Sequence, residues 1–442
     1  MAVDLDDSAV DHGVFEVGVF GQGSEYPVES IRLNPSAEPL EHRVPFTELL
    51  RQVTPRTARP GDPQHRLDEE PRVRARATGI TFPAKAVRAD ERPLRIGQGH
   101  ADQGHLHLAT LNHFALNMGI LKRQQTLGDD KEIDVVAFTH LDTDHCNRAK
   151  DVFHLEHAAK YQGGDRIKIK TIWVPATAIL EEGVEGQART LRAEARHRFI
   201  EGKGIRVFSR PDALDQFLRD RDIEPSKRRN LITDAGTLCP EFNLAADGVE
   251  FFAHSPFAEH TDNGVVVRNA SALFMQATFE VEGRATKLIL SADVDHETID
   301  SIVRVTRYHK NDTRLEWDIN NVPHHSSYTS LAEEKGGEET HPVDRLRWLY
   351  ETQGRSAGIL VSTSDPIPSE DTTQPPHRQA ANYYKRVARD LGGQFIVTME
   401  HPSKTSPKPL VIEIGGTGAK VRKAAGGTPA VIAAPAPRAG SL

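Results

Sequence analysis

The stretch Ile133-Asp134-Val135-Val136-Ala137-Phe138, which Thr139 joins to His140-Leu141-Asp142-Thr143-Asp144-His145, guides the interpretation of the whole chain. Its first part is short, apolar and rich in β-branched residues, which predicts a buried strand. Its second part presents two histidines and two carboxylates, where an ordinary turn would use Gly, Asn or Pro. Imidazole together with carboxylate suits zinc, manganese or iron, whereas calcium and magnesium prefer oxygen alone. We therefore predict a metal site at the end of this strand, with the following candidate ligands: His140, Asp142, Asp144 and His145.

This motif resembles the His-x-His-x-Asp-His signature of the metallo-β-lactamase superfamily. Asp142 stands where the signature has its second histidine. That variant is similar to the branch containing the hydrolase domain of bacterial DNA-uptake competence proteins and related phosphodiesterase-like proteins. The resemblance implies an α/β protein with a four-layer αββα sandwich and a metal-dependent hydrolase activity. Because the superfamily hydrolyses β-lactams, thioesters, lactones, RNA and DNA, the motif by itself does not choose a substrate.

Two later stretches resemble the same branch, in the same order along the chain. An apolar strand at 287–291 leads into Ala292-Asp293, which resembles the Gly-Asp position whose carboxylate bridges two metals. The stretch 321–327 contains Pro-His-His-Ser-Ser and resembles the Pro-His-His-Gly-Ser sequence of the branch. The resemblance implies that His325 is a metal ligand and that His324 faces the substrate and donates a proton. The reverse assignment of the two histidines stays open.

Other histidines are less certain members of the site. His377 follows two prolines and precedes a predicted helix at 378–391, so it is either a substrate contact or a helix-capping or packing residue. The usual lone histidine ligand between the first motif and Asp293 has no clear match, and His254 and His260 are the nearest candidates. With Asp142 also replacing a histidine, the first metal position is expected to be weaker or richer in oxygen. Two divalent ions are predicted, zinc as the first choice and manganese as the second.

Composition limits the class of protein. The chain has 442 residues, 38% of them hydrophobic, and a formal net charge of −8. No stretch reaches the length of a membrane-spanning helix, and the N-terminus does not read as a secretion signal, so we predict a cytoplasmic protein without the channel of the competence proteins. Its two cysteines, Cys146 and Cys239, exclude a disulfide framework. The acidic charge weakens a nuclease interpretation but does not exclude a local phosphate site.

The expected organisation is one hydrolase domain over residues 1–422, with a poorly matched insertion at 34–107 and a disordered Ala-, Gly- and Pro-rich tail at 423–442. Residues 1–12 are predicted to be frayed. Residues 14–20 and 28–33 are predicted to form an opening hairpin. A helix is expected at 108–121 and another at 148–161. Alternating strands and helices over the following residues favour a layered α/β architecture.

The function predicted from these residues is hydrolysis by a hydroxide that two metals activate. The branch resemblance alone makes a phosphodiester in nucleic acid or a nucleotide the first choice of substrate, which would make the protein a phosphodiesterase or nuclease. Asp144 would orient the hydroxide, and His324 and His377 would act on the substrate. An alternative enzyme hydrolyses an amide, ester or thioester bond. A non-catalytic scaffold stabilised by metal is the alternative outside enzymes.

Overall fold

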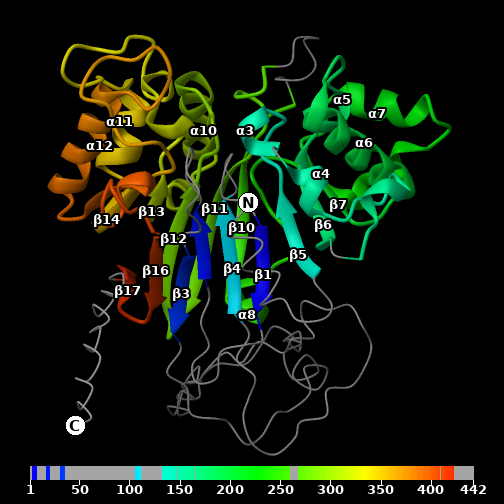
Figure 1. Ribbon diagram of the computed structural model, residues 1–442, viewed down its shortest axis with the longest axis horizontal. Helices are drawn as coiled ribbons and strands as arrows, with labels where there is room; N and C mark the ends of the chain where they lie inside the picture. Colours follow the sequence, from blue (N-terminus) through cyan, green and yellow to red (C-terminus); the bar gives the residue numbers. More distant parts are fainter. Residues whose placement is uncertain are drawn as a thin grey trace, which may run out of the picture.

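The computed structural model describes residues 2–6, 16–19, 30–34, 105–110, 132–146, 148–164, 166–258, 267–408 and 410–422 (Figure 1). Most of the predicted insertion at 34–107, the candidate His260 and the predicted tail at 423–442 lie outside these residues. Within them, helices and strands alternate along the chain, and the predicted α/β class is confirmed.

One sheet contains the strand that carries the first motif. Its order is β2-β4-β1-β5-β6-β7-β8, and β5 to β8 run parallel. These strands are β1 (Ala2–Asp6), β2 (Glu16–Val19), β4 (His105–Thr110), β5 (Glu132–Ala137), β6 (Lys168–Pro175), β7 (Ile205–Phe208) and β8 (Ile232–Thr233). The predicted motif strand is therefore β5, and it lies in the middle of the sheet.

A second sheet carries the other two predicted sites. Its order is β15-β14-β13-β12-β11-β10-β9. Its strands are β9 (Thr237–Leu238), β10 (Val249–Ser255), β11 (Phe274–Val281), β12 (Arg284–Leu290), β13 (Trp317–Asn321), β14 (Gly354–Ser362) and β15 (Gln394–Val397). β11 and β12 form a hairpin about Glu282-Gly283, and β12 to β15 run parallel. A small third sheet joins β3 (Ser30–Asn34), β16 (Val411–Gly415) and β17 (Gly418–Val421).

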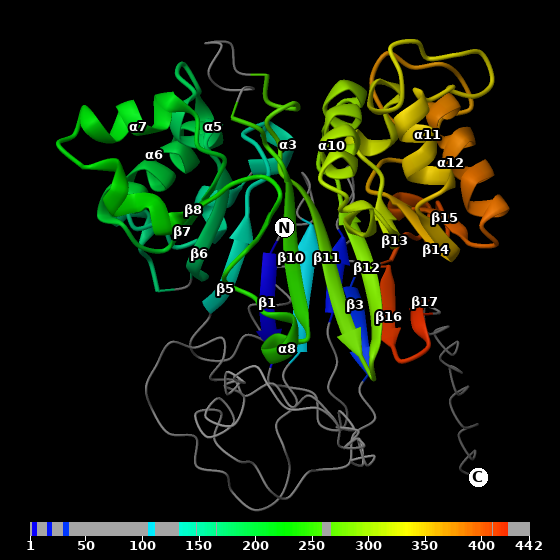
Figure 2. The same ribbon diagram turned by 180° about the vertical axis from the view of Figure 1, so that it is seen from behind.

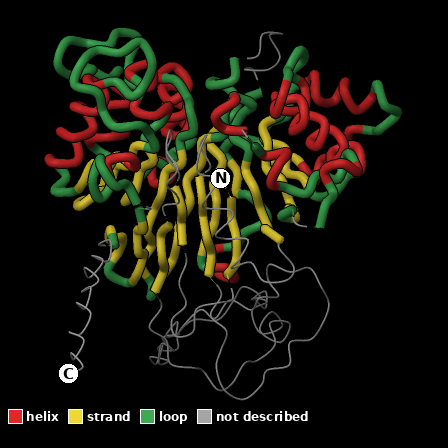
Figure 3. The backbone as a smooth tube through the Cα atoms, viewed as in Figure 1, coloured by secondary structure: helices red, strands yellow, loops and turns green. Residues whose placement is uncertain are grey.

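Helices gather in two groups, one beside each large sheet (Figures 1 and 2). The first group is α5 (Thr177–Leu180), α6 (Gly186–Glu201) and α7 (Asp212–Arg219). The second is α10 (His296–Tyr308), α11 (Asp344–Glu351) and α12 (Arg378–Asp390). Figure 3 shows the strands gathered between the two groups. Shorter helices are α3 (Thr143–Cys146), α4 (Ala149–Val152) and α8 (Leu244–Asp247).

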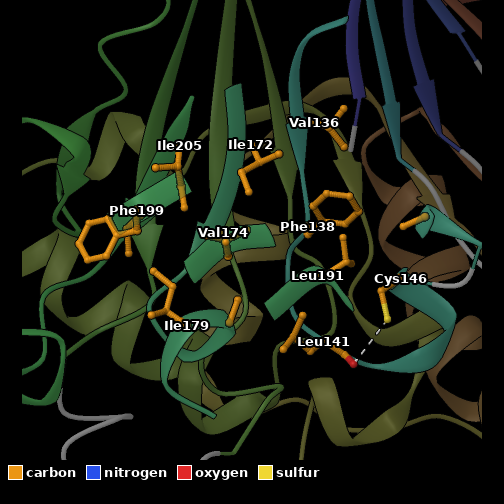
Figure 4. Close-up of a cluster of buried hydrophobic side chains, with 14 of the residues drawn as sticks. Val136, Phe138, Leu141, Cys146, Ile172, Val174, Ile179, Leu191, Phe199 and Ile205 are labelled. Atoms are coloured by element: carbon orange, nitrogen blue, oxygen red, sulfur yellow. Dashed lines mark hydrogen bonds between the residues drawn. The ribbon is translucent and has the colours of Figure 1, made fainter. Parts of the chain in front are cut away.

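Three apolar clusters hold these elements together. One packs β5, β6 and β7 against α5, α6 and α7, and it includes Cys146, whose thiol donates to the Leu141 carbonyl (Figure 4). Another packs the second sheet against α10, α11 and α12. The third joins residues of both large sheets with β16, and Trp173 and Phe251 meet edge to face within it. Burial of apolar surface in the third cluster brings the strand ends of the two sheets together.

Several predictions for the N-terminal part are wrong. Residues 2–6 form β1, paired with β4 and β5, where frayed chain was expected. β2 pairs with β4 and β3 pairs with β16, so the expected opening hairpin does not form. Residues 108–110 belong to a strand instead of starting a helix. The helix predicted at 148–161 is broken: α4 covers only Ala149–Val152, and Phe153 bridges to Ile167.

Candidate metal centre

The predicted site residues come from strand ends that meet between the two sheets. The first motif follows β5, Asp293 follows β12, and His324 and His325 follow β13. The backbone N–H of Leu273, just before β11, donates to the Thr139 carbonyl at 3.2 Å and links the two strand ends. In parallel sheets the carboxyl ends of the strands form one edge, which explains why residues far apart in sequence converge here.

Four of the predicted ligands form a tight cluster: Asp144, His145, Asp293 and His325. One donor atom from each lies within 4.8 Å of all the others. Asp293 Oδ2 lies 3.2 Å from His145 Nε2 and 3.3 Å from His325 Nε2. Asp144 Oδ2 lies 3.2 Å from His325 Nε2 and 3.5 Å from His145 Nε2. The two imidazoles therefore direct their Nε2 atoms at the same pair of carboxylates.

Contacts behind the imidazoles fix which ring nitrogen faces the cluster. His325 Nδ1 lies 2.8 Å from the carbonyl oxygen of Thr363, which follows β14, so Nδ1–H donates there and Nε2 faces inward. Thr139 Oγ1 lies 3.1 Å from His140 Nδ1 and 3.3 Å from His145 Nδ1. Metal-binding histidines typically use the second nitrogen in this way, which sets the tautomer and the ring orientation. The arrangement leaves lone pairs on Nε2 for a cation.

The carboxylates and imidazoles of the cluster shift one another's pKa values. Burial by itself would raise the pKa of Asp293, yet His145 and His325 beside it hold that pKa well below its usual range. Burial would lower the pKa of His325, but Asp293 and Asp144 raise it well above the ordinary value. A proton on His325 thus occupies the space between two carboxylates that a divalent cation would otherwise bridge.

Two unusual turns present the ligands. Ala292 has φ 47°, and three consecutive residues, His324, His325 and Ser326, have φ of 46°, 53° and 64°. Left-handed backbone is costly for residues other than glycine and persists where the surrounding structure enforces it. Here the His324 N–H donates to the Ala292 carbonyl at 2.9 Å, and Ser326 Oγ lies 2.7 Å from Ser362 Oγ. Ala292 and Ser326 are the two positions where the motifs that this sequence resembles have glycine.

Asp142 and His140 lie beside the cluster. His140 is buried, and its Nε2 faces Asp142 Oδ2 at 3.5 Å. The other oxygen of Asp142 accepts from Arg268 Nη1 at 2.6 Å, and Arg268 also binds Glu181 at 2.7 Å. Sequence reasoning did not identify Arg268 or Thr139 as part of the site. Thr139 directly precedes His140, which the sequence did single out, whereas no sequence signal described above marks Arg268.

The two remaining predicted histidines differ in exposure. His324 Nε2 lies 3.9 Å from Asp293 Oδ2, and its side chain is 25% exposed. His377 is buried behind the turn. Its backbone N–H donates to the Ser326 carbonyl, and its ring Nδ1 accepts from the backbone N–H of Tyr328 at 3.3 Å. His324 thus lies on the open side of the cluster, whereas His377 supports the turn from within.

His254 does not join the cluster. Its Nε2–H donates to the Arg314 carbonyl at 2.9 Å, and its Nδ1 lies 3.2 Å from the hydroxyl of Thr306 on α10. Both ring nitrogens are therefore engaged elsewhere, and His254 does not supply the missing ligand. Cys146 is free and buried, and burial raises the pKa of its thiol to about 12, which suits packing and not ligation.

No family model matches the chain, and no curated protein matches it either. Across the described ranges, no helix has the length and apolar character needed to span a membrane. The chemistry of the site therefore stands on its own residues: Asp144, His145, Asp293 and His325 form a largely buried cluster that could hold a metal ion.

Proposed function

We propose that this protein is a metal-dependent hydrolase with the αββα arrangement of the metallo-β-lactamase superfamily. The observation that carries the proposal is the four-residue cluster, in which two carboxylates and two imidazoles converge with Nδ1 of each imidazole engaged behind it. Such a set of donors suits zinc or manganese better than calcium or magnesium. The two groups of helices beside the paired sheets support the fold.

One ion in this cluster is the centre we propose, in place of the two ions that the sequence predicts. Asp144, His145, Asp293 and His325 would hold it. When bound, a divalent ion lowers the pKa of a water toward neutrality and offsets negative charge that develops on the attacked group. Manganese accepts more than four ligands, so four protein donors would leave room for water and substrate. A tetrahedral zinc would be filled by the same four donors.

The residues on the open side would handle the substrate. The side chains of Asp144 and His324 are 27% and 25% exposed, whereas those of His145, Asp293 and His325 are buried. Asp144 can accept a hydrogen bond from an attacking water and so orient it. His324 can deliver a proton to a leaving group, because its ring lies beside the cluster without being one of the four closest donors.

A phosphodiester remains the preferred substrate class, and the resemblance of the motifs supports it. A metal-stabilised scaffold is the second candidate, and it has an observation of its own. Structural zinc sites are closed by four protein ligands, and this cluster offers four. The exposure of Asp144 and His324 favours the enzyme, since a structural site has no need of an open side.

The experiment is a hydrolysis screen of the protein loaded with manganese or with zinc, using bis(p-nitrophenyl) phosphate, p-nitrophenyl acetate and a thioester. We expect phosphodiester turnover, faster with manganese. His324→Gln should keep its ion and lose about 10²- to 10⁴-fold in rate, the range for removal of a general acid. Tyr308→Gln, at an exposed position on α10, is the control and should match the wild type. A metal-loaded protein that turns over none of the three would favour the scaffold.

A further inference from the structure

We infer that Arg268 limits the centre to one ion, because its guanidinium occupies the carboxylate that a second ion would need. This inference rests on the proposed metal centre and concerns the neighbouring position formed by His140 and Asp142. His140 offers the same kind of donor as His145: its Nδ1 lies by the Thr139 hydroxyl, and its Nε2 is buried 3.5 Å from Asp142 Oδ2. Donors for a second position therefore exist in part.

The contacts of Arg268 show how that position is closed. Arg268 Nη1 lies 2.6 Å from Asp142 Oδ1. On its other side, Arg268 Nη2 lies 2.7 Å from Glu181 Oε1, and Nε lies 2.9 Å from the same oxygen. Glu181 directly follows α5, so a helix end fixes the guanidinium while it binds Asp142. The exposed fraction of the Glu181 side chain is 13%, which limits competition by water.

A second cation would have to displace or approach this guanidinium. Arginine stays charged at every relevant pH and has no lone pair to offer a metal. It therefore repels a nearby cation and also holds the oxygen that would ligate it. His140 alone, with a share of Asp293, would make a weak site. In the four-residue cluster the shared carboxylate faces imidazoles instead: Asp293 lies 3.2 Å from His145 Nε2 and 3.3 Å from His325 Nε2, and neutral imidazoles can bind a cation.

In the signature that this sequence resembles, a histidine stands at the position of Asp142. The sequence alone therefore predicted that the first metal position is weaker or richer in oxygen. Arg268 gives that change a physical consequence. A histidine at this point would not attract a guanidinium, whereas a carboxylate does. The aspartate therefore serves as the partner of an internal cation. Removal of Arg268 should free Asp142 and create a second metal position.

The test counts ions per chain after saturation with manganese and removal of excess, by elemental analysis, with electron paramagnetic resonance as a second readout. We expect one ion in the wild type and two in Arg268→Gln. Two manganese ions sharing Asp293 should also give an exchange-coupled spectrum, which a single ion cannot give. Arg268→Met keeps the apolar stem without charge and repeats the test if the Gln variant folds poorly. Thermal unfolding of each variant checks its fold.

Two controls separate the site from general effects. Arg345→Gln removes a guanidinium that binds Asp300 at the surface between α10 and α11, and it should keep one ion. Arg268→Gln combined with Asp142→Asn should return to one ion, because the new carboxylate ligand is gone. Two ions in that double variant would place the extra ion elsewhere and overturn the inference.

The remaining outcomes are also decisive. Two ions in the wild type, or one ion in both Arg268 variants, would overturn the role of Arg268 and leave the proposed metal hydrolase intact. No ion in the wild type would overturn the proposed metal centre itself, and this inference with it.

Discussion

Two buried clusters of charged side chains in this molecule differ in the partners that their carboxylates contact. Glu194 on α6 accepts from Arg198 Nε at 2.7 Å, from the backbone N–H groups of Glu156 and His157, and lies 2.9 Å from His157 Nδ1. Arg198 also donates to the Ile169 and Gly204 carbonyls. The chain itself thus supplies a permanent cation and satisfies both partners.

The cluster of Asp144, His145, Asp293 and His325 instead sets carboxylates against imidazoles: both Asp144 and Asp293 lie against the rings of His145 and His325. Buried carboxylates raise one another's pKa and destabilise the fold unless a cation or a proton intervenes. A buried carboxylate closed by an arginine of the chain forms the first, structural kind of cluster, whereas buried carboxylates that face imidazoles form the second kind, a candidate for a bound ion. The Asp142–Arg268 pair belongs to the first kind, although it lies beside the second.

The largest expected effect comes from a substitution in the cluster of Asp144, His145, Asp293 and His325. Asp293→Ala removes the carboxylate that both His145 and His325 face. We expect metal affinity to fall by more than about 100-fold, beyond the effect of losing an outer contact, and turnover to disappear. The metal-free variant should be less stable than the metal-free wild type, because His145 and His325 lose the buried carboxylate whose charged form they stabilise. Calorimetric titration with manganese and thermal unfolding in chelator measure both. Full activity in this variant would end the metal hydrolase proposal.

The next largest effect comes from a substitution in the cluster of Glu194 and Arg198. Glu194→Ala leaves the buried Arg198 without its nearest carboxylate, with only Glu156 at 3.6 Å, and should lower the free energy of unfolding by about 3–5 kcal/mol. Metal and chelator should not change that loss. Glu182→Ala is the matched control, since its carboxylate also binds arginines on α6 but is 74% exposed, and it should cost less than about 1 kcal/mol. Equal losses in the two variants would contradict the structural role of Glu194.

His254 extends the comparison, because both ring nitrogens of this buried histidine contact groups of the chain itself, the Thr306 hydroxyl and the Arg314 carbonyl. Burial lowers its pKa from 6.5 to about 4. The unfolded chain therefore binds a proton before the folded protein does. The stability that the neutral ring supplies is fully present above pH 6.5, and it falls by about 3 kcal/mol as the pH drops to about 4. Denaturant unfolding in chelator at several pH values measures this loss, and His254→Gln should show a shallower slope. An unchanged slope would contradict the assignment.

The smallest effect concerns the support of the imidazoles. Thr139→Val removes the hydroxyl that lies beside Nδ1 of both His140 and His145. We expect metal affinity to fall about 10- to 100-fold, as for other contacts behind metal-binding histidines. Thr278→Val, a buried change on β11 whose hydroxyl binds Gln276, should leave affinity unchanged. Equal affinities for the Thr139 variant and the wild type would show that the hydroxyl does not orient the rings.

Local patterns in the sequence predicted structural elements that depend mainly on residues close together along the chain. The β-branched run before the first motif predicted β5. Asp293 and His325 were found only because their motifs follow in the expected order, since nothing local distinguishes them from other polar residues at strand ends. The helix α10 was overlooked although a signal was present: Ile299, Ile302, Val303 and Thr306 recur at helical spacing and are buried.

Contacts between distant parts of the chain were beyond such patterns. Arg268 meets Asp142 across 126 positions, and only the packed sheets bring them together. The pairing of β3 with β16 joins residues near opposite ends of the chain, which explains why the local hairpin was the wrong choice. The same alternation of apolar residues suits either partner, and long-range packing decides between them.

The most direct test of the metal centre is the thermal unfolding of the wild-type protein, first stripped with chelator and then titrated with manganese or zinc. An ion that binds only the folded state stabilises it by about 2.7 kcal/mol at a free concentration 100 times the Kd. We predict a saturable rise in Tm for the wild type and none for Asp293→Ala. An identical Tm for the stripped and titrated wild-type protein, with no ion retained, would contradict the account.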